Sequence, residues 1–346
     1  MPSGFLPVNI QLFSYHELRS ATDNFSAHNK IGRGGFGTVY KGILRDGKQV
    51  AVKVLSAESK QGVHEFLTEI DMLSNVKHPN LVELIGCCVQ ESNRIILYEY
   101  VENSSLDRVL LGTKDRAIKL DWGVRSAICT GTARGLVFLH EGLEPYIVHR
   151  DIKASNILLA NDFIPKIGDF GLAKIFPDNI THISTRVVGT TGYLAPEYAM
   201  HGQLTKKADV YSFGVLMLEI ISGRSNSQAI WGGTQKTWKL YEEGKLLELV
   251  DPELEEYPRD EVIRYIKVAL FCTQAASLRR PSVTQAFSML SRDIRLNEQE
   301  LTPPGFYFSI ASTGTPPISN KNSASSDSIS KPVSFSHFTM TQVAPR

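Results

Sequence analysis

The segment from His149 to Asn156 carries acidic, basic and amide side chains at a spacing that suits proton and anion chemistry. Asp151 can accept a hydrogen bond from an incoming hydroxyl, orient that hydroxyl and later take its proton. Lys153 can neutralise a phosphoryl group in transfer, and Asn156 offers a neutral oxygen to a divalent ion. Arg150 has the fork-shaped guanidinium that binds a phosphate on another part of the chain. The alternative, a loop of solvated charges, is the weaker interpretation of this combination.

A second acidic residue stands at a distance that suits a metal ligand. Asp169 follows Asn156 by thirteen residues, after the apolar Ile167 and before Phe170 and Gly171. A carboxylate between a predicted strand and a glycine suits an oxygen-seeking ion such as Mg²⁺. Asp-Phe-Gly alone is also a common turn, so the separation from Asn156 carries the interpretation.

The segment between Asp169 and Glu197 is rich in hydroxyl side chains. A phosphate on Ser184 or Thr185 would add negative charge that can pair with Arg150 and order the segment. The alternative is that these residues are merely polar members of a loop.

A glycine-rich segment near the start of the chain has the pattern Gly-x-Gly-x-x-Gly. Glycines let the backbone approach a polyphosphate and turn its N–H groups toward it. The same pattern occurs in plain turns and in dinucleotide sites, where a helix follows the loop. Here Thr38–Gly42 alternates like a strand, which favours a flap between two strands. The candidate phosphate-binding residues are Ile31, Gly32, Arg33, Gly34, Gly35, Phe36 and Gly37.

Lys53 lies in an apolar, β-rich stretch, Lys48–Val54. It shares a strand face with the small Ala51, which leaves room for a flat ring beside the charge. There it can reach phosphate oxygens if a carboxylate holds it in place. Glu69, sixteen residues on in the predicted helix Val63–Val76, is the candidate carboxylate. The alternatives are a lysine that points to solvent and a glutamate on the helix surface.

The overall composition excludes several classes of protein. The 346 residues carry 37 basic and 36 acidic side chains, so bulk charge gives no indication of a nucleic-acid partner. The four cysteines form no Cys-x-x-Cys pair, which favours buried thiols over a disulfide framework. The apolar run Val215–Ile221 is too short for a transmembrane segment, and the first residues resemble neither a signal peptide nor a myristoylation site. These features predict a cytoplasmic protein.

Changes in apolar spacing and in composition along the chain predict four regions. Residues 1–25 are expected to be an approach segment, 26–101 mostly short strands with one helix, and 102–296 mainly helices. Residues 297–346 are rich in Ser, Thr and Pro, which predicts a disordered tail. We therefore expect an α+β fold with a small strand-rich lobe and a larger helical lobe. The longer helices expected in the second lobe are Val124–Leu139, Ala208–Ser222 and Asp260–Ala276.

In order and spacing, these motifs resemble those of eukaryotic protein kinases. The resemblance rests on the glycine-rich loop, Val50-Ala51-Val52-Lys53, Glu69, His149-Arg150-Asp151, Asn156, Asp169-Phe170-Gly171 and Ala195-Pro196-Glu197. It covers about residues 13–296 and implies the bilobal kinase fold, with an antiparallel-β N-lobe and a mainly α-helical C-lobe. It also implies transfer of the ATP γ-phosphoryl group to Ser or Thr hydroxyls of proteins, with Mg²⁺ or Mn²⁺ as the metal.

The resemblance implies a role for each residue that matches a motif. Lys53 would pair with Glu69 and hold phosphate oxygens. Asp169 and Asn156 would bind the metal, and Asp151 would be the catalytic base. These residues are therefore the expected catalytic centre.

The same resemblance implies an adenine site and several supporting contacts. Lys153 and Thr190 match the pattern of serine/threonine kinases. Asp209 would hold the catalytic loop, the segment from His149 to Asn156, in place. Arg280 would pair with Glu197. Tyr98 falls at the gatekeeper position, next to the hinge. The residues expected around the adenine are Val39, Ala51, Tyr98, Glu99, Val101 and Leu158.

Further strings narrow the resemblance to plant receptor-like kinases of the Pelle-related class. They are Phe13–Leu18, Ala21–Ser26, Leu84–Cys88 and Gly189–Tyr198, and the nearest resemblance is to the cold-responsive, receptor-like cytoplasmic kinase group. This implies autophosphorylation, stress or defence signalling, an upstream receptor kinase, and contact with the plasma membrane only through partners. One departure is the stretch between Gly223 and Trp238, which is shorter than in relatives.

Two other functions are alternatives to an active enzyme. A pseudokinase scaffold, which binds partners without catalysis, would have lost Lys53, Asp151 or Asp169, and the sequence retains all three. A nucleotide-dependent oxidoreductase would need a strand–turn–helix and a ribose-binding acid, and neither is visible. The sequence therefore favours an active serine/threonine kinase.

Overall fold

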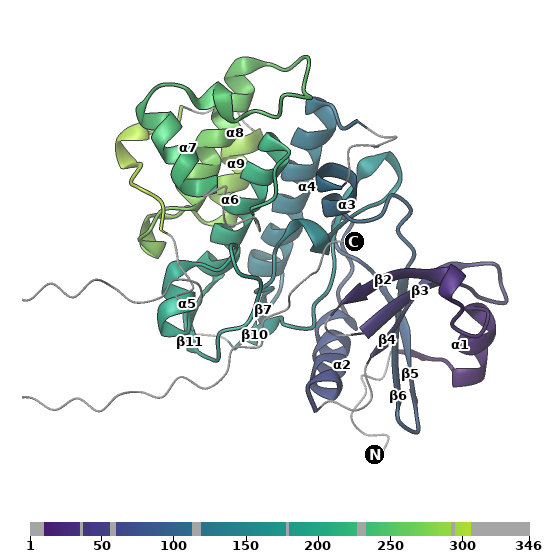
Figure 1. The fold of residues 1–346 in the computed structure, drawn as a ribbon. Helices are drawn as coiled ribbons and strands as arrows, with labels where there is room; N and C mark the ends of the chain where they lie inside the picture. The colour runs from purple at the N-terminus through teal and green to yellow at the C-terminus, as the bar shows by residue number, and fades with distance from the viewer. Residues whose placement is uncertain are drawn as a thin grey trace, which may run out of the picture.

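The computed structural model describes residues 10–34, 37–55, 60–112, 119–177, 180–226, 233–291 and 295–305. Three parts named above lie outside these ranges: Gly35 and Phe36 of the predicted phosphate loop, residues 227–232 between Gly223 and Trp238, and residues 306–346 of the predicted tail. A strand-rich N-lobe and a larger helical C-lobe lie side by side (Figure 1). The elements are β1 (Gln11–Leu12), α1 (Tyr15–Ala21), β2 (Lys30–Gly34), β3 (Gly37–Ile43), β4 (Gln49–Leu55), α2 (Lys60–Leu73), β5 (Leu84–Gln90), β6 (Asn93–Glu99), α3 (Leu106–Leu111), α4 (Trp122–Glu141), β7 (Tyr146–Val148), β8 (Ile157–Leu159), β9 (Pro165–Ile167), β10 (Lys174–Phe176), β11 (Ile183–Ser184), α5 (Pro196–His201), β12 (Gln203–Leu204), α6 (Lys206–Ser222), α7 (Gly233–Glu242), α8 (Arg259–Cys272) and α9 (Val283–Ser291).

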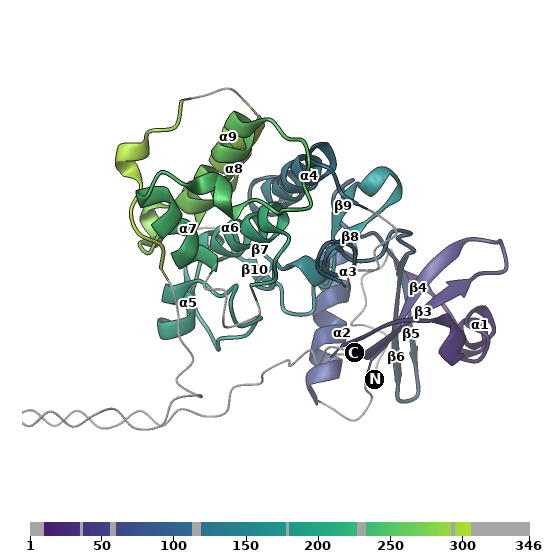
Figure 2. The same ribbon diagram turned by 45° about the horizontal axis from the view of Figure 1, so that its top comes forward.

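A six-stranded sheet forms the N-lobe, in the order β1-β5-β6-β4-β3-β2. Only the pair β1 and β5 is parallel within it. Strand alternation sets the two faces: Val50 and Val52 are fully buried in one cluster, and Lys53 points to the opposite face. The helix α2 lies on that opposite face (Figure 2). Phe66 and Ile70 bury its apolar stripe, as the helical spacing predicts.

Residues 10–25, expected to be an approach segment, are packed into the N-lobe. β1 extends the sheet beside β5, and α1 follows it. α1 starts with a capping box, in which Ser14 Oγ accepts from the Glu17 N–H at 3.2 Å and Glu17 Oε2 accepts from the Ser14 N–H at 2.8 Å. Leu18 is fully buried in the same cluster as Val50. This segment is therefore part of the N-lobe core.

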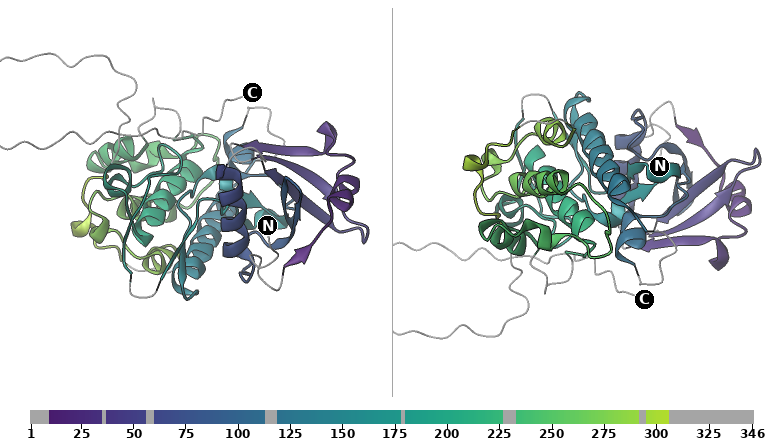
Figure 3. Two further views of the ribbon diagram at one scale, coloured as in Figure 1. Left: turned by 90° about the horizontal axis from the view of Figure 1, so that it is seen from below. Right: turned by 90° about the horizontal axis from the view of Figure 1, so that it is seen from above.

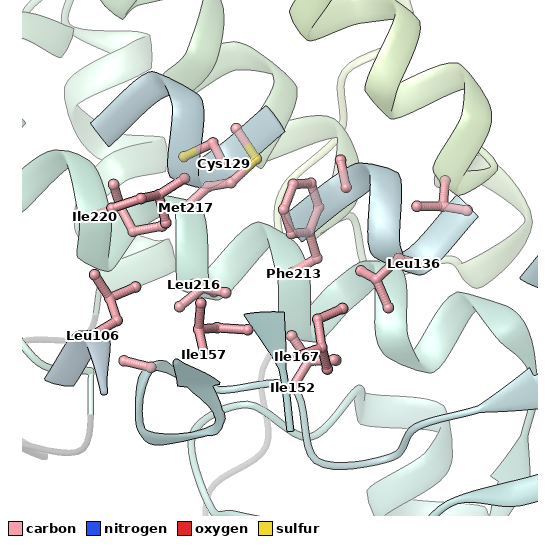
Figure 4. Packing of buried hydrophobic residues seen from close by; sticks show 14 of the residues in the cluster. Leu106, Cys129, Leu136, Ile152, Ile157, Ile167, Phe213, Leu216, Met217 and Ile220 are labelled. Carbon is pink, nitrogen blue, oxygen red and sulfur yellow. The ribbon is translucent and has the colours of Figure 1, made fainter. Parts of the chain in front are cut away.

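α6 is the central helix of the C-lobe. Every residue from Ala208 to Ser222 is buried. The Thr205 side chain accepts from the Lys207 N–H at its start, and Gly223 ends it in the left-handed conformation. Figure 4 shows the core that α6 shares with α4 and with the strands below them. Its labelled members include Cys129 and Leu136 on α4, Phe213 and Leu216 on α6, and Ile152, Ile157 and Ile167 around the predicted catalytic loop.

Residues 297–305 correct the expectation of a disordered tail that begins at 297. The Gly305 N–H donates to Thr273 O at 3.0 Å, and the Tyr211 hydroxyl donates to Gly305 O at 2.6 Å. These bonds use main-chain groups of the tail, which any residue type supplies, so the Ser, Thr and Pro content did not reveal them.

The segment 302–305 also meets the end of α8, which comes earlier than predicted, and the Ala275 N–H donates to Pro303 O at 3.3 Å rather than within the helix. α8 stops at Cys272, whereas the apolar spacing favoured a helix to Ala276. The side-chain Oε1 of Gln274 accepts from the N–H and the hydroxyl of Thr302, at 3.0 and 2.8 Å. α4 and α6 agree with their predicted ranges to within two residues.

The two lobes also stand at opposite ends of the molecule when it is seen from below or above (Figure 3). Within the described ranges, no helix has the length and apolar character needed to cross a bilayer. All four cysteines lie in these ranges, buried and free, as expected.

Candidate active site

Lys53 connects the two lobes through two carboxylates. Its Nζ lies 2.5 Å from Glu69 Oε1 on α2 and 2.8 Å from Asp169 Oδ1 in the segment after β9. Strand alternation turns Lys53 toward α2, and Glu69 is fully buried on the face of α2 that meets the sheet. The structure thus brings Lys53 and Glu69 together as expected, and it adds Asp169 as a second partner.

Burial and charge act in opposite directions on these three groups. Burial disfavours the Lys53 ammonium, but Asp169 and Glu69 outweigh it and raise the pKa of Lys53. Burial likewise opposes the charged form of Asp169, and Lys53 outweighs it and lowers the Asp169 pKa. For Glu69 burial dominates and raises the pKa to about 7, despite Lys53. Its Oε2 has no hydrogen-bond partner among the described residues, which fits this balance.

Asp151 lies within a group of hydrogen-bonded side chains. Its Oδ1 accepts from the Thr190 hydroxyl at 2.7 Å, and its Oδ2 lies 2.6 Å from Lys153 Nζ. Lys153 also donates to Thr190 Oγ1 at 2.8 Å. Asn156 Nδ2 donates to the main-chain oxygen and to Oδ2 of Asp151, at 2.8 and 3.1 Å. The structure therefore gathers the predicted residues 151, 153, 156 and 190 around one carboxylate.

Asp209 on α6 binds the main chain just before Asp151. Its oxygens accept the main-chain N–H groups of His149 and Arg150, each at 2.8 Å, and Oδ2 lies 2.8 Å from His140 Nε2. Burial opposes its charge, yet the bond and the charge of His140 outweigh burial and lower the Asp209 pKa. Arg150 has a φ of 72°, which residues other than glycine seldom adopt. The two amide bonds to Asp209 hold that conformation.

Two oxygen atoms near this group fit a divalent ion. Asp169 gives Oδ1 to Lys53, and no described residue bonds to its Oδ2. Asn156 uses its Nδ2 on Asp151, which leaves its amide oxygen without a partner in the described ranges. Carboxylate and amide oxygens are suitable ligands for Mg²⁺ or Mn²⁺. The described ranges hold no cluster of three or more His, Cys, Asp or Glu side chains that could bind a metal.

The strands around the glycine-rich loop approach one another closely. Gly37 has a φ of 150°, and a Cβ there would lie 2.2 Å from Val54 O, so only glycine fits. Val39 lies opposite Lys53 in the register of β3 and β4. The structure places Ile31 to Gly34 on β2, whereas Gly35 and Phe36 lie outside the described residues.

The residues expected around an adenine lie on elements of both lobes. Tyr98 is buried opposite Ala51 in the register of β4 and β6, and its hydroxyl has no hydrogen-bond partner among the described residues. Glu99 ends β6 with its Oε1 2.8 Å from Lys166 Nζ on β9. The remaining positions are Val39 on β3, Val101 just after β6 and Leu158 on β8.

The arrangement of these residues agrees with the family whose sequence pattern the chain matches. Residues 25–290 match the family described as protein tyrosine and serine/threonine kinase. The chain belongs to this protein kinase family. The bilobal fold expected from the motifs is thereby confirmed.

Three relatives indicate the class of this kinase. Over 305 residues it is 52% identical to Cold-responsive protein kinase 1 of Arabidopsis thaliana. This match covers 86% of the kinase and 78% of the relative. It is 51% and 50% identical to two probable LRR receptor-like serine/threonine-protein kinases of the same plant, over 296 and 303 residues. These matches cover 84% and 86% of the kinase but only 28% and 29% of the relatives. The protein is a serine/threonine protein kinase of the plant receptor-like type, and such kinases use ATP, a divalent metal and protein substrates.

Ser184 of the kinase ends strand β11, which pairs with β12, and Thr185 follows it directly. Ser184 is exposed and pairs with Gln203, and the Thr185 N–H donates to Gly202 O at 3.0 Å. The next residue, Arg186, accepts from Arg150 through its main-chain oxygen. The two candidate phosphorylation sites therefore stand one and two residues before a contact with Arg150.

Glu197 and Arg280 form the predicted pair in the C-lobe of the kinase. Both terminal nitrogens of Arg280 donate to the Glu197 carboxylate, at 2.7 and 2.8 Å. The Arg280 side chain is fully buried, and its Nε donates to Gln274 O at 2.8 Å. This fork fixes α5 to the segment after α8.

Two tyrosines of the kinase make site contacts that the sequence did not predict. Tyr193 donates to Glu219 Oε2 on α6 at 2.5 Å. Tyr198 places its hydroxyl against Arg150 at 2.6 Å. Both belong to the string that resembles plant receptor-like kinases, but neither spacing nor residue type showed which way their hydroxyls point.

Proposed function

We propose that this kinase is catalytically active and transfers the ATP γ-phosphoryl group to Ser or Thr hydroxyls, with Asp151 as the base. One observation carries the proposal: Asp151 Oδ1 already accepts a hydrogen bond from an alcohol, that of Thr190, at 2.7 Å. A carboxylate that orients a hydroxyl in this way can orient an acceptor hydroxyl and take its proton.

The neighbouring side chains supply positive charge for the reaction. Lys153, 2.6 Å from Asp151, would neutralise the phosphoryl group as it moves to the acceptor. Lys53, fixed by Glu69 and Asp169, would hold phosphate oxygens of the nucleotide. Most of the acceleration would come from this positioning and charge neutralisation.

We propose Asp169 and Asn156 as the ligands of Mg²⁺, or of Mn²⁺. In each of the two side chains one oxygen has no hydrogen-bond partner among the described residues, which supports this assignment. When bound there, the ion would neutralise phosphate charge. Asp151 would keep its place meanwhile, because Asn156 binds it through the opposite atom of the amide, Nδ2.

The nucleotide would lie between the glycine-rich loop and the hinge. Gly37 allows the close approach of β3 to β4, which supports a phosphate site beside these two strands. Val39, Ala51 and Leu158 would contact the adenine, next to Tyr98 and the main chain from Glu99 to Val101.

The biological role is proposed from the relatives alone. The name of one relative refers to cold, and others are probable receptor-like kinases. We therefore propose autophosphorylation, a role in plant stress or defence signalling, and an upstream receptor kinase as partner. A cytoplasmic location, with contact to the plasma membrane through partners, accords with this role.

The decisive experiment is incubation of the purified protein with Mg-ATP and a protein substrate, followed by mapping of the phosphorylated residues. Asp169→Asn should abolish turnover, and Asp151→Asn should lower it by roughly 10²–10⁴-fold with a smaller effect on ATP binding. Asp260→Asn, an exposed position in the first turn of α8, is the matched control. A wild-type protein that binds ATP without transfer would establish the alternative, a pseudokinase scaffold. Wild-type turnover in Asp151→Asn would remove Asp151 as the base.

A further inference from the structure

Arg150 binds only neutral oxygen atoms in the described structure. Its Nη1 donates to Leu172 O at 3.2 Å, and its Nη2 donates to Arg186 O at 2.9 Å. The Tyr198 hydroxyl accepts from Nη2 at 2.6 Å and from Nε at 3.2 Å. No carboxylate in the described ranges pairs with this partly buried cation. Such a cation forms a stronger, charge-assisted bond when an anion reaches it.

Tyr198 delivers its hydroxyl to this place from α5. The residue is only 1% exposed, and its hydroxyl also accepts from the Val188 N–H at 3.0 Å and donates to Arg186 O at 3.1 Å. One oxygen atom thus connects Arg150 with both ends of the segment 186–188. A phenylalanine would fill the same space, so packing alone does not require the hydroxyl.

We propose that Tyr198 is a positioning residue that holds residues 186–188 in place while the kinase carries no phosphate there. Its hydroxyl gives Arg150 an uncharged partner, and a phosphate on Ser184 or Thr185 supplies a charged one instead. This inference deepens the proposed phosphate-binding role of Arg150 and rests on it.

The held segment leads directly to the catalytic group. Val188 is followed two residues later by Thr190, whose hydroxyl bonds to Asp151 and whose oxygen accepts from Lys153. Because only Gly189 separates Val188 from Thr190, movement of residues 186–188 is expected to displace Thr190. Loss of the Tyr198 hydroxyl is expected to matter most in the unphosphorylated kinase, because a phosphate otherwise secures Arg150.

Tryptic cleavage after Arg186 reports on this contact directly, because trypsin attacks the carbonyl that Arg150 and Tyr198 bind. Phosphatase-treated protein is compared without ATP as wild type, Tyr198→Phe and Tyr211→Phe. Tyr211→Phe is the matched control, since it also removes one buried hydroxyl, which donates to Gly305 O. We expect cleavage after Arg186 to become about tenfold faster in Tyr198→Phe alone. Equal rates in wild type and Tyr198→Phe, or an equal rise in Tyr211→Phe, would overturn the proposal.

A cycle of variants tests the consequence for phosphoryl transfer to myelin basic protein. Tyr198→Phe is introduced into the autophosphorylated wild type and into the Ser184→Ala/Thr185→Ala variant. We expect a loss of less than about threefold in the first and of about tenfold or more in the second. The same fold-loss in both backgrounds would overturn the proposal. If the wild type itself shows no turnover, the proposed function fails, whereas cleavage after Arg186 still decides the role of Tyr198.

Discussion

The Thr190 hydroxyl donates to Asp151 Oδ1 at 2.7 Å. It also accepts from Lys153, so this hydroxyl binds both members of the direct ion pair between the proposed base and the neighbouring cation. Thr190→Val keeps the shape of the side chain but leaves the carboxylate without this donor. We expect kcat to fall by about 10–100-fold, as for the loss of a hydrogen bond to a charged group. Thr190→Ser should retain most of the turnover in steady-state assays. A Thr190→Val kinase within about twofold of wild type would contradict this account.

Asp209 should be essential for stability as well as for geometry. It is fully buried and accepts two main-chain N–H groups and a histidine, which Asp209→Ala would leave without partners. We expect a loss of about 3–5 kcal/mol in the free energy of unfolding, measured by urea denaturation. Asp260→Ala, an exposed position, should change it by less than about 0.5 kcal/mol. If the two variants lose the same amount, the buried network does not stabilise the lobe.

Arg280 should not tolerate replacement by lysine. Its guanidinium binds the two Glu197 oxygens and also the main-chain oxygens of Gln274, Lys207 and Ala275. A single ammonium cannot span these acceptors, so Arg280→Lys should cost about 2–4 kcal/mol of unfolding free energy. Arg45→Lys, at an exposed turn, is the control with no expected effect. Equal stability of the two variants would show that the fork adds nothing.

Glu219 should make stability depend on pH. Burial raises its pKa to about 7, and the bonds from Tyr193 and Asn226 only partly offset this. The unfolded chain releases the proton near 4.5, so between these values the folded kinase binds more protons. The unfolding free energy should therefore decrease as pH rises from about 4.5 to about 7, by at most about 3 kcal/mol, and this group should add no change above that.

The comparison that isolates this effect is Glu219→Gln against wild type. The amide cannot titrate, so its stability relative to wild type should increase with pH across the same interval. Urea unfolding of both proteins at several pH values from about 5 to about 8 measures the difference. A difference that stays constant with pH would mean that Glu219 does not titrate in this range.

Local spacing explains why much of the site was predictable. Lys53 and Glu69 are placed by strand alternation and by helical spacing within one lobe, and both patterns are visible in the sequence. Asp151, Lys153 and Asn156 lie in one short loop, so their proximity follows from the chain itself. In contrast, the contact of Lys53 with Asp169 joins positions 116 residues apart. The resemblance to kinases placed both residues in one catalytic centre, but it did not predict their contact.

Other contacts could not be predicted from residue types or from the spacing of apolar residues. The hydroxyl of Tyr198 lies at Arg150 because α5 is anchored elsewhere, through Glu197 and Arg280. Gly305 binds through its main chain, which carries no sequence signal. The role of Leu18 depends on β1 adding to the sheet edge, and two residues are too few to show a strand period.

The stretch that matches the kinase family, residues 25–290, is shorter than the folded unit. A protein trimmed to that stretch would keep every residue proposed for catalysis. It would nevertheless leave a cavity at the place of the buried Leu18 side chain. The hydroxyl of Tyr211 would also lose its acceptor, Gly305 O. Recombinant versions intended for crystallisation or enzymology should accordingly begin no later than residue 10 and end no earlier than residue 305.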